Sequence, residues 1–583
     1  MVMRDALLNN YFTGLKNIDA VYGSFIMYKF GQAFMEYVGE KYGKWFVVRI
    51  LENLHQSEDF DEILSISLGK SIDEIDAEWT SHERKKYFPL VNTHSPISLK
   101  AKKIISGGYN FDPNIRVDTA HQKYQLIYTA NKDGYSSLYL SEMDSSFASE
   151  IKSERLLTAE RGADFESVHL FEPSLAVSQR GIAAFITRSK ASDVIHFFDI
   201  STKEKLNTIR FDSIISISDP SFTSDGSLLF RGIDKRGLTD IYRYDQTGNL
   251  IRLTNDQFND RYPTEGLQSD QIIFVSDRTK SGEKVFNNLF SITNSGEGLE
   301  QLTSAESNFA YPKVSSDKKR IITANDADGV FNLYSIQIND NRLADSIVPL
   351  SALYTGLESP FAIYNDNIFF TSIDRLSFDI YKYRLKSDDS ISISPIATHS
   401  SEIQKADNFK VLSAGVKKSV VNYSEEYTLD YAQSQISTDP VFGTRGGALF
   451  SLSDLLGDDR FFMLLFNTAE TQTDFLENFN VDIFRLNSKH RTNWGYGIFN
   501  YRGRRYDLRE SDEYYYEKSF GSYFVLQYPL SSFERVETSL SLANVNKDII
   551  GFGNDTKSLL LSNSVAYVFD NALWGLNRTA RRD

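Results

Sequence analysis

The sequence contains no cysteine, and long apolar runs and basic residues are scarce. Without cysteine, neither a disulfide bond nor thiolate chemistry is available to the chain. No run of about 18 apolar residues occurs, so the sequence offers no candidate transmembrane helix. Membrane-spanning strands stay open, because their alternating pattern is much weaker. The first residues, MVMRDALLNNYF, lack the basic region and apolar core of a secretory signal.

Positively charged residues are also fewer than negatively charged ones. The chain has 63 Lys and Arg against 78 Asp and Glu, which gives a formal net charge of −15. Nucleic-acid-binding proteins present a basic face. Here the basic blocks are limited to residues 84–86 and the terminal stretch 578–582. We therefore expect no nucleic acid among the partners.

Two motifs of hydrolases are absent as well. None of the 8 histidines stands four residues from another, so the HExxH zinc motif does not occur. His82-Glu83 begins like this motif, but Lys86 stands where the second histidine would be. His196 lies in the apolar segment VIHFF, which favours a packed core residue over a ligand. The Gly-x-Ser-x-Gly elbow is missing too. The sequence therefore predicts no catalytic residue, no metal site and no cofactor.

Proline is rare, and half of the 12 prolines recur in a pattern. From the second onward, their steps are 47, 43, 49 and 48 residues, the size of one four-stranded propeller blade. Each is followed by turn signals and strand-like runs, as in the stretch SFTSDGSLLFRGIDKRGLTDIYRY after Pro220. The six prolines are Pro113, Pro173, Pro220, Pro263, Pro312 and Pro360.

One strand signal stands ahead of the first copy of this repeat. The segment from Lys103 to Ser106 looks like the strand that links successive copies, but there is no earlier copy to which it belongs. We expect it to form the outer strand of the last blade, because this closes the ring and removes two open sheet edges. An unclosed row of β-meanders is the alternative.

The order of proline, Ser-Asp-Gly, a strand ending in Ser/Thr-Asp and then Asp/Asn-Ile/Leu-Tyr resembles the TolB-like, WD-like propeller repeats. The resemblance covers about residues 100–398, and four of the six copies match well. It implies a propeller that binds a protein or peptide, commonly in a bacterial envelope.

Loops at the ends of the ring are the expected contact sites, among them Asp234–Gly237, Asp277–Gly282 and Asp326–Gly329. Their aspartates could bind a cation or a basic partner, and they also serve as ordinary turn formers. The candidate partner-binding residues are Asp234, Arg236, Asp277, Arg278, Asp326 and Asp328.

Residues 1–92 have helical character. Apolar residues between positions 28 and 38 recur at helical spacing, and Ser71 with Glu74 has the signature of a capping box. The stretch YGSFIMYKFGQAFMEYVGEKYG, with the later LGKSIDEIDAEW, resembles the tail of gluzincin-type metallopeptidase domains. The resemblance implies a helical remnant whose zinc-binding part is missing, so no catalytic residue is carried over.

Residues 399–440 are interpreted as a linker or short strands, and residues 441–583 as an antiparallel sheet. The segments TRGGALFSLSDLLGD and VAYVFDNALWG resemble outer-membrane barrels of the BamA-like surface-antigen type. The resemblance implies part of such a barrel, and a soluble sheet is the alternative. Six strand candidates are Phe461–Thr468, Phe475–Leu486, Trp494–Tyr501, Tyr514–Tyr528, Phe533–Val545 and Ser558–Phe569.

The sequence thus predicts a mainly β protein. A six-bladed β-propeller (100–398) follows an N-terminal α-helical segment (1–92) and precedes an antiparallel, partly barrel-like sheet. The expected role is a non-enzymatic binding or scaffold protein of the bacterial cell envelope (periplasm or outer membrane), with a protein or peptide partner. The outer membrane is a second candidate partner, through the C-terminal strands.

Two alternatives remain open. One is a fragment of a propeller-containing zinc metallopeptidase, and the other is an outer-membrane assembly or pore protein with a propeller gate. Because both ends resemble interrupted domains, we expect the 583 residues to be an interior fragment, or a frameshifted reading, of a longer envelope protein.

Overall fold

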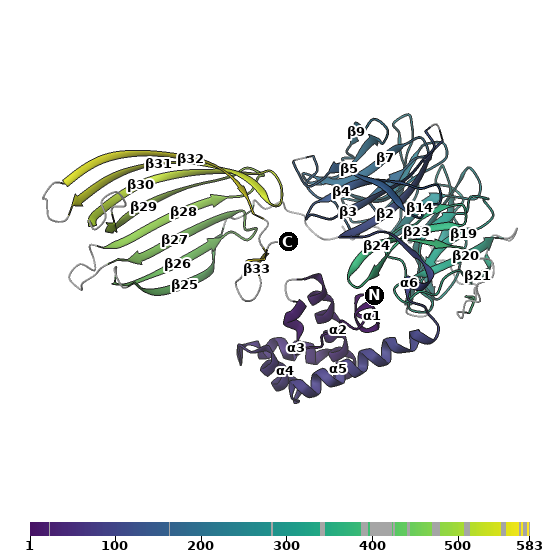
Figure 1. The fold of residues 1–583 in the computed structure, drawn as a ribbon, viewed down its shortest axis with the longest axis horizontal. Helices are drawn as coiled ribbons and strands as arrows, with labels where there is room; N and C mark the ends of the chain where they lie inside the picture. Colours follow the sequence, from purple (N-terminus) through teal and green to yellow (C-terminus); the bar gives the residue numbers. More distant parts are fainter. Residues whose placement is uncertain are drawn as a thin grey trace, which may run out of the picture. The chain divides into compact units, whose positions relative to one another are not determined.

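The computed structural model comprises two compact units, Met1–Val411 with Trp574–Arg581, and Leu412–Leu573 with the last two residues (Figure 1). The structure describes residues 1–21, 24–119, 121–162, 164–281, 284–338, 344–385, 394–396, 423, 426–439, 443–468, 478–506, 514–549, 555–570, 573–574 and 580–581. Most of the predicted linker, and Gly282 of one predicted contact loop, lie outside these ranges.

The chain begins with a helical lobe, residues 1–100. The predicted capping box is confirmed, since Ser71 Oγ accepts a hydrogen bond from the Glu74 N–H while the Glu74 carboxylate accepts one from the Ser71 N–H. Trp79 and Phe34 lie in the apolar core of the lobe. Its elements are α1 (Val2–Leu8), η1 (Ile18–Val21), α2 (Phe25–Lys41), α3 (Lys44–Glu52), η2 (Asn53–His55), α4 (Phe60–Leu68), α5 (Ile72–Tyr87), η3 (Phe88–Asn92) and α6 (Ile97–Lys100).

Residues 102–384 form six four-stranded antiparallel blades around a common centre (Figure 1). Blade 1 contains β2 (Tyr109–Asp118), β3 (Lys123–Asn131), β4 (Ser136–Met143) and β5 (Glu150–Thr158). Blade 2 contains β6 (Leu175–Val177), β7 (Ile182–Ser189), β8 (Ser192–Asp199) and β9 (Glu204–Ile209). Blade 3 contains β10 (Ile214–Phe222), β11 (Leu228–Asp234), β12 (Thr239–Tyr244) and β13 (Leu250–Arg252).

The remaining blades follow the same order. Blade 4 contains β14 (Asp260–Glu265), β15 (Gln271–Ser281), β16 (Lys284–Thr293) and β17 (Glu300–Gln301). Blade 5 contains β18 (Phe309–Val314), β19 (Ile321–Asn325), β20 (Asn332–Ile338) and β21 (Ala344–Pro349). Blade 6 contains β22 (Ala362–Tyr364), β23 (Asn367–Asp374), β24 (Ser377–Arg384) and β1 (Lys102–Ile105).

The ring closes as the sequence predicts. β1 pairs with β24 in antiparallel register, with Lys103 opposite Tyr381 and Ile105 opposite Ile380. A short parallel pairing of Tyr109 with Phe378 also joins the first and last blades. The strand that precedes the first copy of the repeat therefore completes the last blade, and the alternative of an unclosed row is wrong.

Apolar packing continues around the whole ring. Six buried clusters lie between neighbouring blades, one at each blade–blade interface. At the interface between blades 6 and 1, for example, Phe369 and Ile380 pack in one cluster with Leu126 and Tyr128. Each blade is a twisted sheet with two apolar faces, so it needs a neighbour on both sides to keep these faces from water.

The second unit is an eight-stranded antiparallel sheet in which strand order follows the sequence. All six predicted strands are present with shifted ends, and β25 lies in the stretch interpreted as linker or short strands. Within the described residues β25 and β32 pair on one side only and form the two edges. The strands are β25 (Thr428–Asp439), β26 (Gly443–Ser453), β27 (Asp459–Asn467), β28 (Phe479–Asn487), β29 (Asn493–Tyr506), β30 (Tyr514–Pro529), β31 (Glu534–Ile549) and β32 (Asp555–Phe569). A two-stranded sheet of β33 (Leu573–Trp574) and β34 (Ala580–Arg581) follows.

Among the helices that the structure describes, none combines the length and the apolar character needed to cross a bilayer.

Candidate functional site

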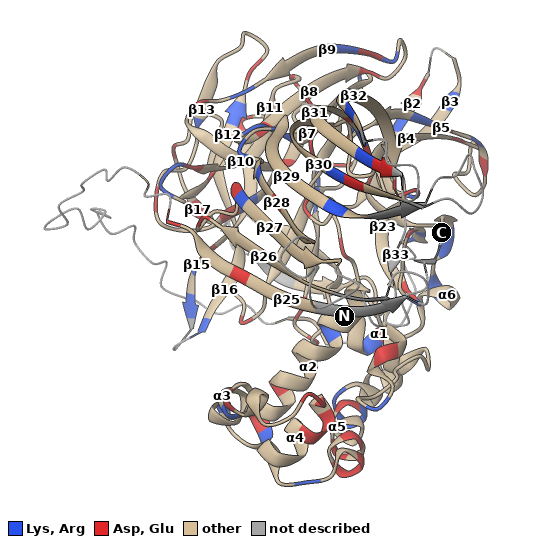
Figure 2. Ribbon diagram, turned by 90° about the vertical axis from the view of Figure 1, so that its left-hand side faces the viewer, with Lys and Arg blue, Asp and Glu red and all other residues tan. Residues whose placement is uncertain are grey.

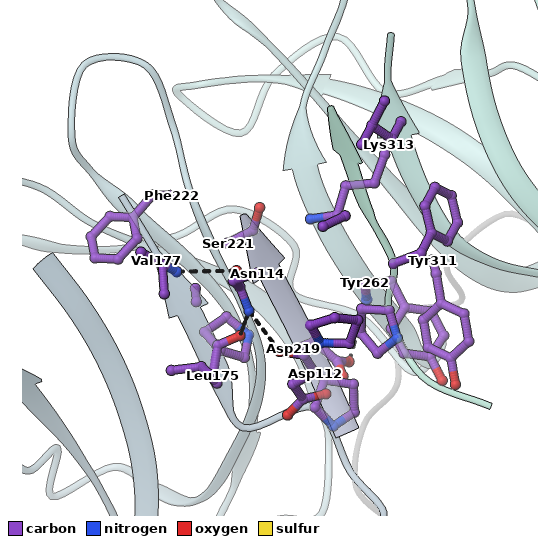
Figure 3. A pocket seen from close by; sticks show the side chains of 18 of the residues that line it. Asp112, Asn114, Leu175, Val177, Asp219, Ser221, Phe222, Tyr262, Tyr311 and Lys313 are labelled. Atoms are coloured by element: carbon purple, nitrogen blue, oxygen red, sulfur yellow. Dashed lines mark hydrogen bonds between the residues drawn. The ribbon is translucent and has the colours of Figure 1, made fainter. Parts of the chain in front are cut away.

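The six recurring prolines meet around one cavity at the centre of the ring, here called the central channel (Figure 3). Four of the prolines lie within the innermost strand of their blade, and Pro173 and Pro360 lie two residues before theirs. The channel has a volume of about 230 Å³, and all six blades contribute to its wall. The spacing that marks the blades in the sequence therefore also marks the positions that line the channel.

The residue before the proline adopts the left-handed backbone conformation in four blades. These residues are Asp112, Asp219, Tyr262 and Tyr311, with φ between 52° and 56°. In each of the four blades the register between the first and second strands shifts at this point. A proline disfavours the right-handed helical conformation before it and removes a donor from the ladder, so a β-bulge fits here.

The two aspartates at these bulges contact the next blade. The Asp112 carboxylate accepts hydrogen bonds from the N–H of Ser174 at 2.8 Å and from its hydroxyl at 3.3 Å. Asp219 accepts one from the Tyr262 N–H at 3.3 Å, and Arg231 Nε lies 3.4 Å from the same carboxylate. These bonds join blade 1 to blade 2 and blade 3 to blade 4.

The two tyrosines continue this series of contacts. The ring centroids of Tyr262 and Tyr311 are 4.5 Å apart, which joins blades 4 and 5. The Tyr311 hydroxyl donates to the Glu358 carbonyl at 3.4 Å, just ahead of blade 6. The pre-proline side chains thus link neighbouring blades at the channel wall.

Burial changes the protonation of the channel carboxyl groups. It raises the pKa of Asp112 to about 7, although the hydrogen bonds from Ser174 favour the charged form. It also raises the pKa of Asp219, against the attraction of Arg231. The two carboxyl groups are therefore held by protein donors and are less acidic than in water.

Among the described residues that line the channel, Lys313 is the one basic side chain. It follows Pro312 on β18, and its amine is directed toward the middle of the channel (Figure 3). Burial lowers its pKa to about 8, and Asp112 opposes this shift. Within the part of the chain that the structure describes, its amine has no hydrogen-bond or ion-pair partner.

The predicted partner-binding residues lie at one end of the ring, in blades 3, 4 and 5. This end, here called the proximal face, is where the innermost strands begin. Asp277 and Arg278 lie within β15 at a shift of register, and the others lie in or at the edge of loops. Asp234 and Arg236 form an ion pair of 2.7 Å in the loop between β11 and β12. In blade 4, Asp277 accepts hydrogen bonds from the Asn259 N–H and side-chain amide at 2.8 and 2.6 Å.

The other three predicted residues are also engaged within the fold. Arg278 is only 2% exposed, and its Nη2 donates to both carboxylate oxygens of Asp260 at 2.8 Å. Asp326 accepts hydrogen bonds from the N–H and side-chain amide of the neighbouring Asn308 at 2.7 and 3.0 Å. Asp328 contacts the buried His94 of the helical lobe, with 2.6 Å between the carboxylate oxygen and Nε2.

The helical lobe covers part of the proximal face. Arg4 donates to the carbonyls of Gly329 and Thr355 at 3.0 and 3.3 Å. The Asp5 carboxylate accepts hydrogen bonds from the N–H groups of Arg375 and Leu376 at 3.3 and 3.2 Å, within the left-handed turn between β23 and β24. These polar contacts fall on blades 5 and 6, and the apolar contacts of the lobe extend to Phe111 of blade 1 and to Phe171 ahead of blade 2. In the described ranges no hydrogen bond or ion pair joins the lobe to the β11–β12 loop of blade 3 or to Asp277 of blade 4.

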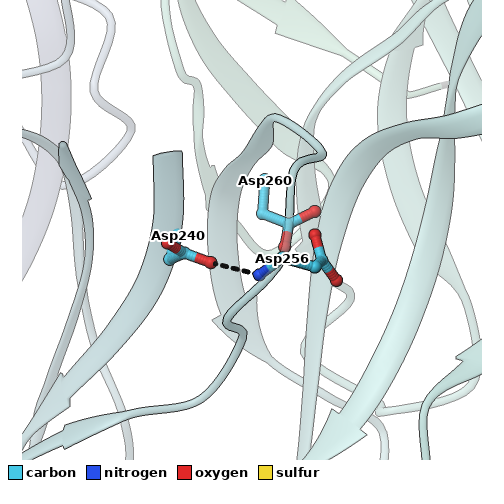
Figure 4. A group of neighbouring side chains, drawn as sticks. All are labelled: Asp240, Asp256 and Asp260. Atoms are coloured by element: carbon cyan, nitrogen blue, oxygen red, sulfur yellow. Dashed lines mark hydrogen bonds between the residues drawn. The ribbon is translucent and has the colours of Figure 1, made fainter. Parts of the chain in front are cut away.

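One cluster of acidic residues has the spacing of a cation site (Figure 4). Oxygens of Asp240, Asp256 and Asp260 lie within 4.8 Å of one another. Two arginines already offset their charge, because Arg252 pairs with Asp240, and Arg278 lies 3.0 Å from Asp256 and 2.8 Å from Asp260. We interpret the cluster as an ion-pair network that fixes blades 3 and 4.

Several solved structures are similar to this chain. TolB from Acinetobacter baumannii is 17% identical with a TM-score of 0.31, over 54% of this chain and 71% of that one. A gluconolactonase from Xanthomonas campestris is 11% identical with a TM-score of 0.33, over 50% of this chain and 94% of that one. Two prolyl endopeptidases are represented by a chain that is 9% identical with a TM-score of 0.32, over 69% of this chain and 55% of that one.

These neighbours include TolB and two kinds of enzyme, and at this identity and TM-score the likeness carries no argument about activity. No family model matches the chain. No curated protein matches it either.

Sequence reasoning missed the channel residues. The recurring prolines mark the blades in the sequence, while the residues beside them carry the side chains of the channel wall. Asp112 and Asp219 directly precede their prolines, and Lys313 directly follows one. A signal was therefore present, because a residue next to a fixed point of each repeat occupies equivalent places around the ring.

The raised pKa of Asp112 predicts a pH-dependent stability. Above about pH 4 the unfolded chain loses this proton, while the folded chain keeps it up to about pH 7. The contribution of Asp112 to the free energy of unfolding should therefore fall between pH 4 and 7, by on the order of 2–4 kcal/mol.

Asp112→Asn removes the titrating group, and asparagine tolerates the left-handed conformation. Calorimetric melts of the full chain at pH 4.5 and 7.5 should show wild type losing more stability than D112N as the pH rises. The exposed Asp270→Asn serves as the control. An equal pH response of wild type and D112N would contradict the burial argument.

Proposed function

We propose that the chain is a non-enzymatic binding protein of the bacterial cell envelope that recognises a protein or peptide with its propeller. The recognition surface is the part of the proximal face at blades 3 and 4, here called the open rim. It consists of the turn Asp234–Leu238 at the end of β11 and the end part of β15 around Asp277.

The observation that carries this proposal is the one-sided placement of the helical lobe. Arg4 and Asp5 fix the lobe on blades 5 and 6 through buried charged groups, and such groups are costly to separate from their partners. The loops of blades 5 and 6 are therefore occupied by the chain itself. The open rim keeps its loop ends available to a partner.

The open rim also presents exposed positive charges to a partner. Lys235 is exposed, and the side chain of Arg236 is 51% exposed while it pairs with Asp234. Charges at the edge of an interface steer a partner and set specificity more than they set affinity. A partner with an acidic segment would meet Lys235 and Arg236 first.

Reversing these charges should weaken capture of the partner. We expect the variant K235E/R236E to bind any envelope protein recovered by the immobilised wild-type chain at least tenfold more weakly, because the rim loses its two exposed cations. Envelope extracts would be passed over both proteins, and the retained protein would be purified and titrated by interferometry.

The matched control is K318E/K319E, which changes two adjacent exposed lysines in the β18–β19 turn at the other end of the ring. If the control loses as much affinity as the rim variant, recognition is not a property of the open rim. If both variants bind like wild type, the proposal is wrong.

A second candidate function, association with a lipid surface through the C-terminal sheet, is favoured by the two unlike faces of that sheet. The cross-strand registers Ile498–Ser522, Ser522–Leu542 and Leu542–Leu561 place these residues side by side on one face. Ile498, Leu542 and Leu561 are 59%, 46% and 68% exposed. Charged residues are sparse along β26 to β28 (Figure 2). Soluble sheets seldom leave so large an apolar face uncovered.

The opposite face of the sheet is polar and aromatic. Asp482 accepts hydrogen bonds from the hydroxyls of Tyr501 and Tyr523. The Tyr523 ring lies flat over Gly497, where an added Cβ would come within 2.6 Å of the ring. This face is satisfied by internal contacts, so the apolar face is the one available to lipid.

Charges on the apolar face should abolish lipid binding. We expect wild type and S541E/S562E to float with vesicles of phosphatidylethanolamine and phosphatidylglycerol, and L542E/L561E to stay at the bottom of the gradient. The two double variants alter adjacent cross-strand pairs on opposite faces, so they differ in the face that they charge. Flotation of L542E/L561E with wild-type yield would rule out this face as the lipid contact.

A further inference from the structure

The central channel has features of a ligand site that are independent of the open rim. All six blades contribute to its wall, and its volume of about 230 Å³ lies below the roughly 300 Å³ at which pockets for drug-sized ligands begin. A ligand of this channel must therefore be small.

Most polar groups of the channel wall already have protein partners. Asp112 is held by Ser174, Asp219 by Tyr262 and Arg231, and Tyr311 donates to a backbone carbonyl. The Asn114 amide accepts from the Val177 N–H at 3.2 Å and donates to the Asp112 carbonyl at 2.9 Å. These groups build the wall, and their hydrogen bonds leave little capacity for a ligand.

Lys313 is different because its amine extends into the channel without a partner among the described residues. A buried ammonium group is costly unless an anion or well-placed acceptors compensate it. Asp112 is the carboxyl group that acts on it electrostatically, but the two are not in ion-pair contact. The channel thus holds one cation with room beside it.

The channel wall also contains aliphatic residues. Ile115, Val177, Val314 and Ile363 line the channel farther along the innermost strands. One cation in a channel with aliphatic residues in its wall suits a ligand with one negative charge and an apolar body. A phosphate group carries more charge and would need further cationic donors, and the described lining holds no second cation.

We propose that the central channel binds a small aliphatic monocarboxylate, with its carboxylate on the Lys313 amine and its chain along Ile115, Val177, Val314 and Ile363. The carboxylate replaces the water that would otherwise solvate the ammonium group. The aliphatic chain covers the apolar wall. Binding at this site does not require a partner at the open rim, so the two proposals can fail separately.

The test uses butyrate as the probe and the full chain as the protein. Isothermal titration should show saturable binding of butyrate to wild type and at least tenfold weaker binding of the neutral butyramide. Lys313→Met keeps the length of the side chain and removes its charge, so it should weaken butyrate binding at least tenfold. The exposed Lys319→Met, on the turn that follows β18, should bind butyrate like wild type.

A second measurement works without any variant. Since the pKa of Lys313 is about 8, the affinity of wild type for butyrate should fall as the pH rises above this value, while that for butyramide stays constant. The proposal is overturned if wild type shows no saturable butyrate binding, if butyramide binds equally well, or if K313M binds butyrate like wild type. A flat pH profile would overturn it as well.

Discussion

The first unit depends on one constraint: no blade can bury its apolar faces alone. Each of the six apolar clusters takes residues from two neighbouring blades, so the sheets stabilise one another only as a closed ring. Closure needs a last strand that the repeat itself does not supply. β1 provides it, and the polypeptide thereby joins its first propeller strand to its last blade.

The recurring prolines serve this ring at its inner edge. In four blades a proline within the innermost strand removes a ladder donor and accompanies a bulge, and the residue before it then reaches the adjacent blade. Asp112 does so with hydrogen bonds and Tyr262 with a ring contact. The same geometry opens a channel into which Lys313 extends. Packing, backbone conformation and a candidate binding site thus arise from a single feature of the repeat.

Much of the fold could be predicted because its signals are local and repeated. The proline spacing and the turn residues predicted the six blades. The strand signal at Lys103, which has no earlier copy of the repeat, predicted how the ring closes. The capping box at Ser71 was readable because it involves residues three positions apart. β25 was harder, since Thr428–Asp439 is polar and has no repeat to support it.

The site was less predictable because burial and pairing depend on contacts between distant residues. Arg278 looks like a loop cation in the sequence, yet Asp260 and Asp256 hold it inside blade 4. Asp328 lies in a predicted contact loop, but His94 from a segment 234 residues away occupies it. Conversely, Lys313 belongs to no sequence motif, and only the arrangement of the blades around the channel identifies it as a candidate ligand-binding residue.

Ring closure can be measured directly because the chain has no cysteine of its own. Lys102 and Lys382 are register partners on β1 and β24, within the range at which paired cysteines on adjacent strands can form a disulfide. The account predicts that the variant K102C/K382C forms this bond on mild oxidation, giving a faster-migrating band on a non-reducing gel. If the two cysteines stay free while the protein is folded, the ring is not closed by β1.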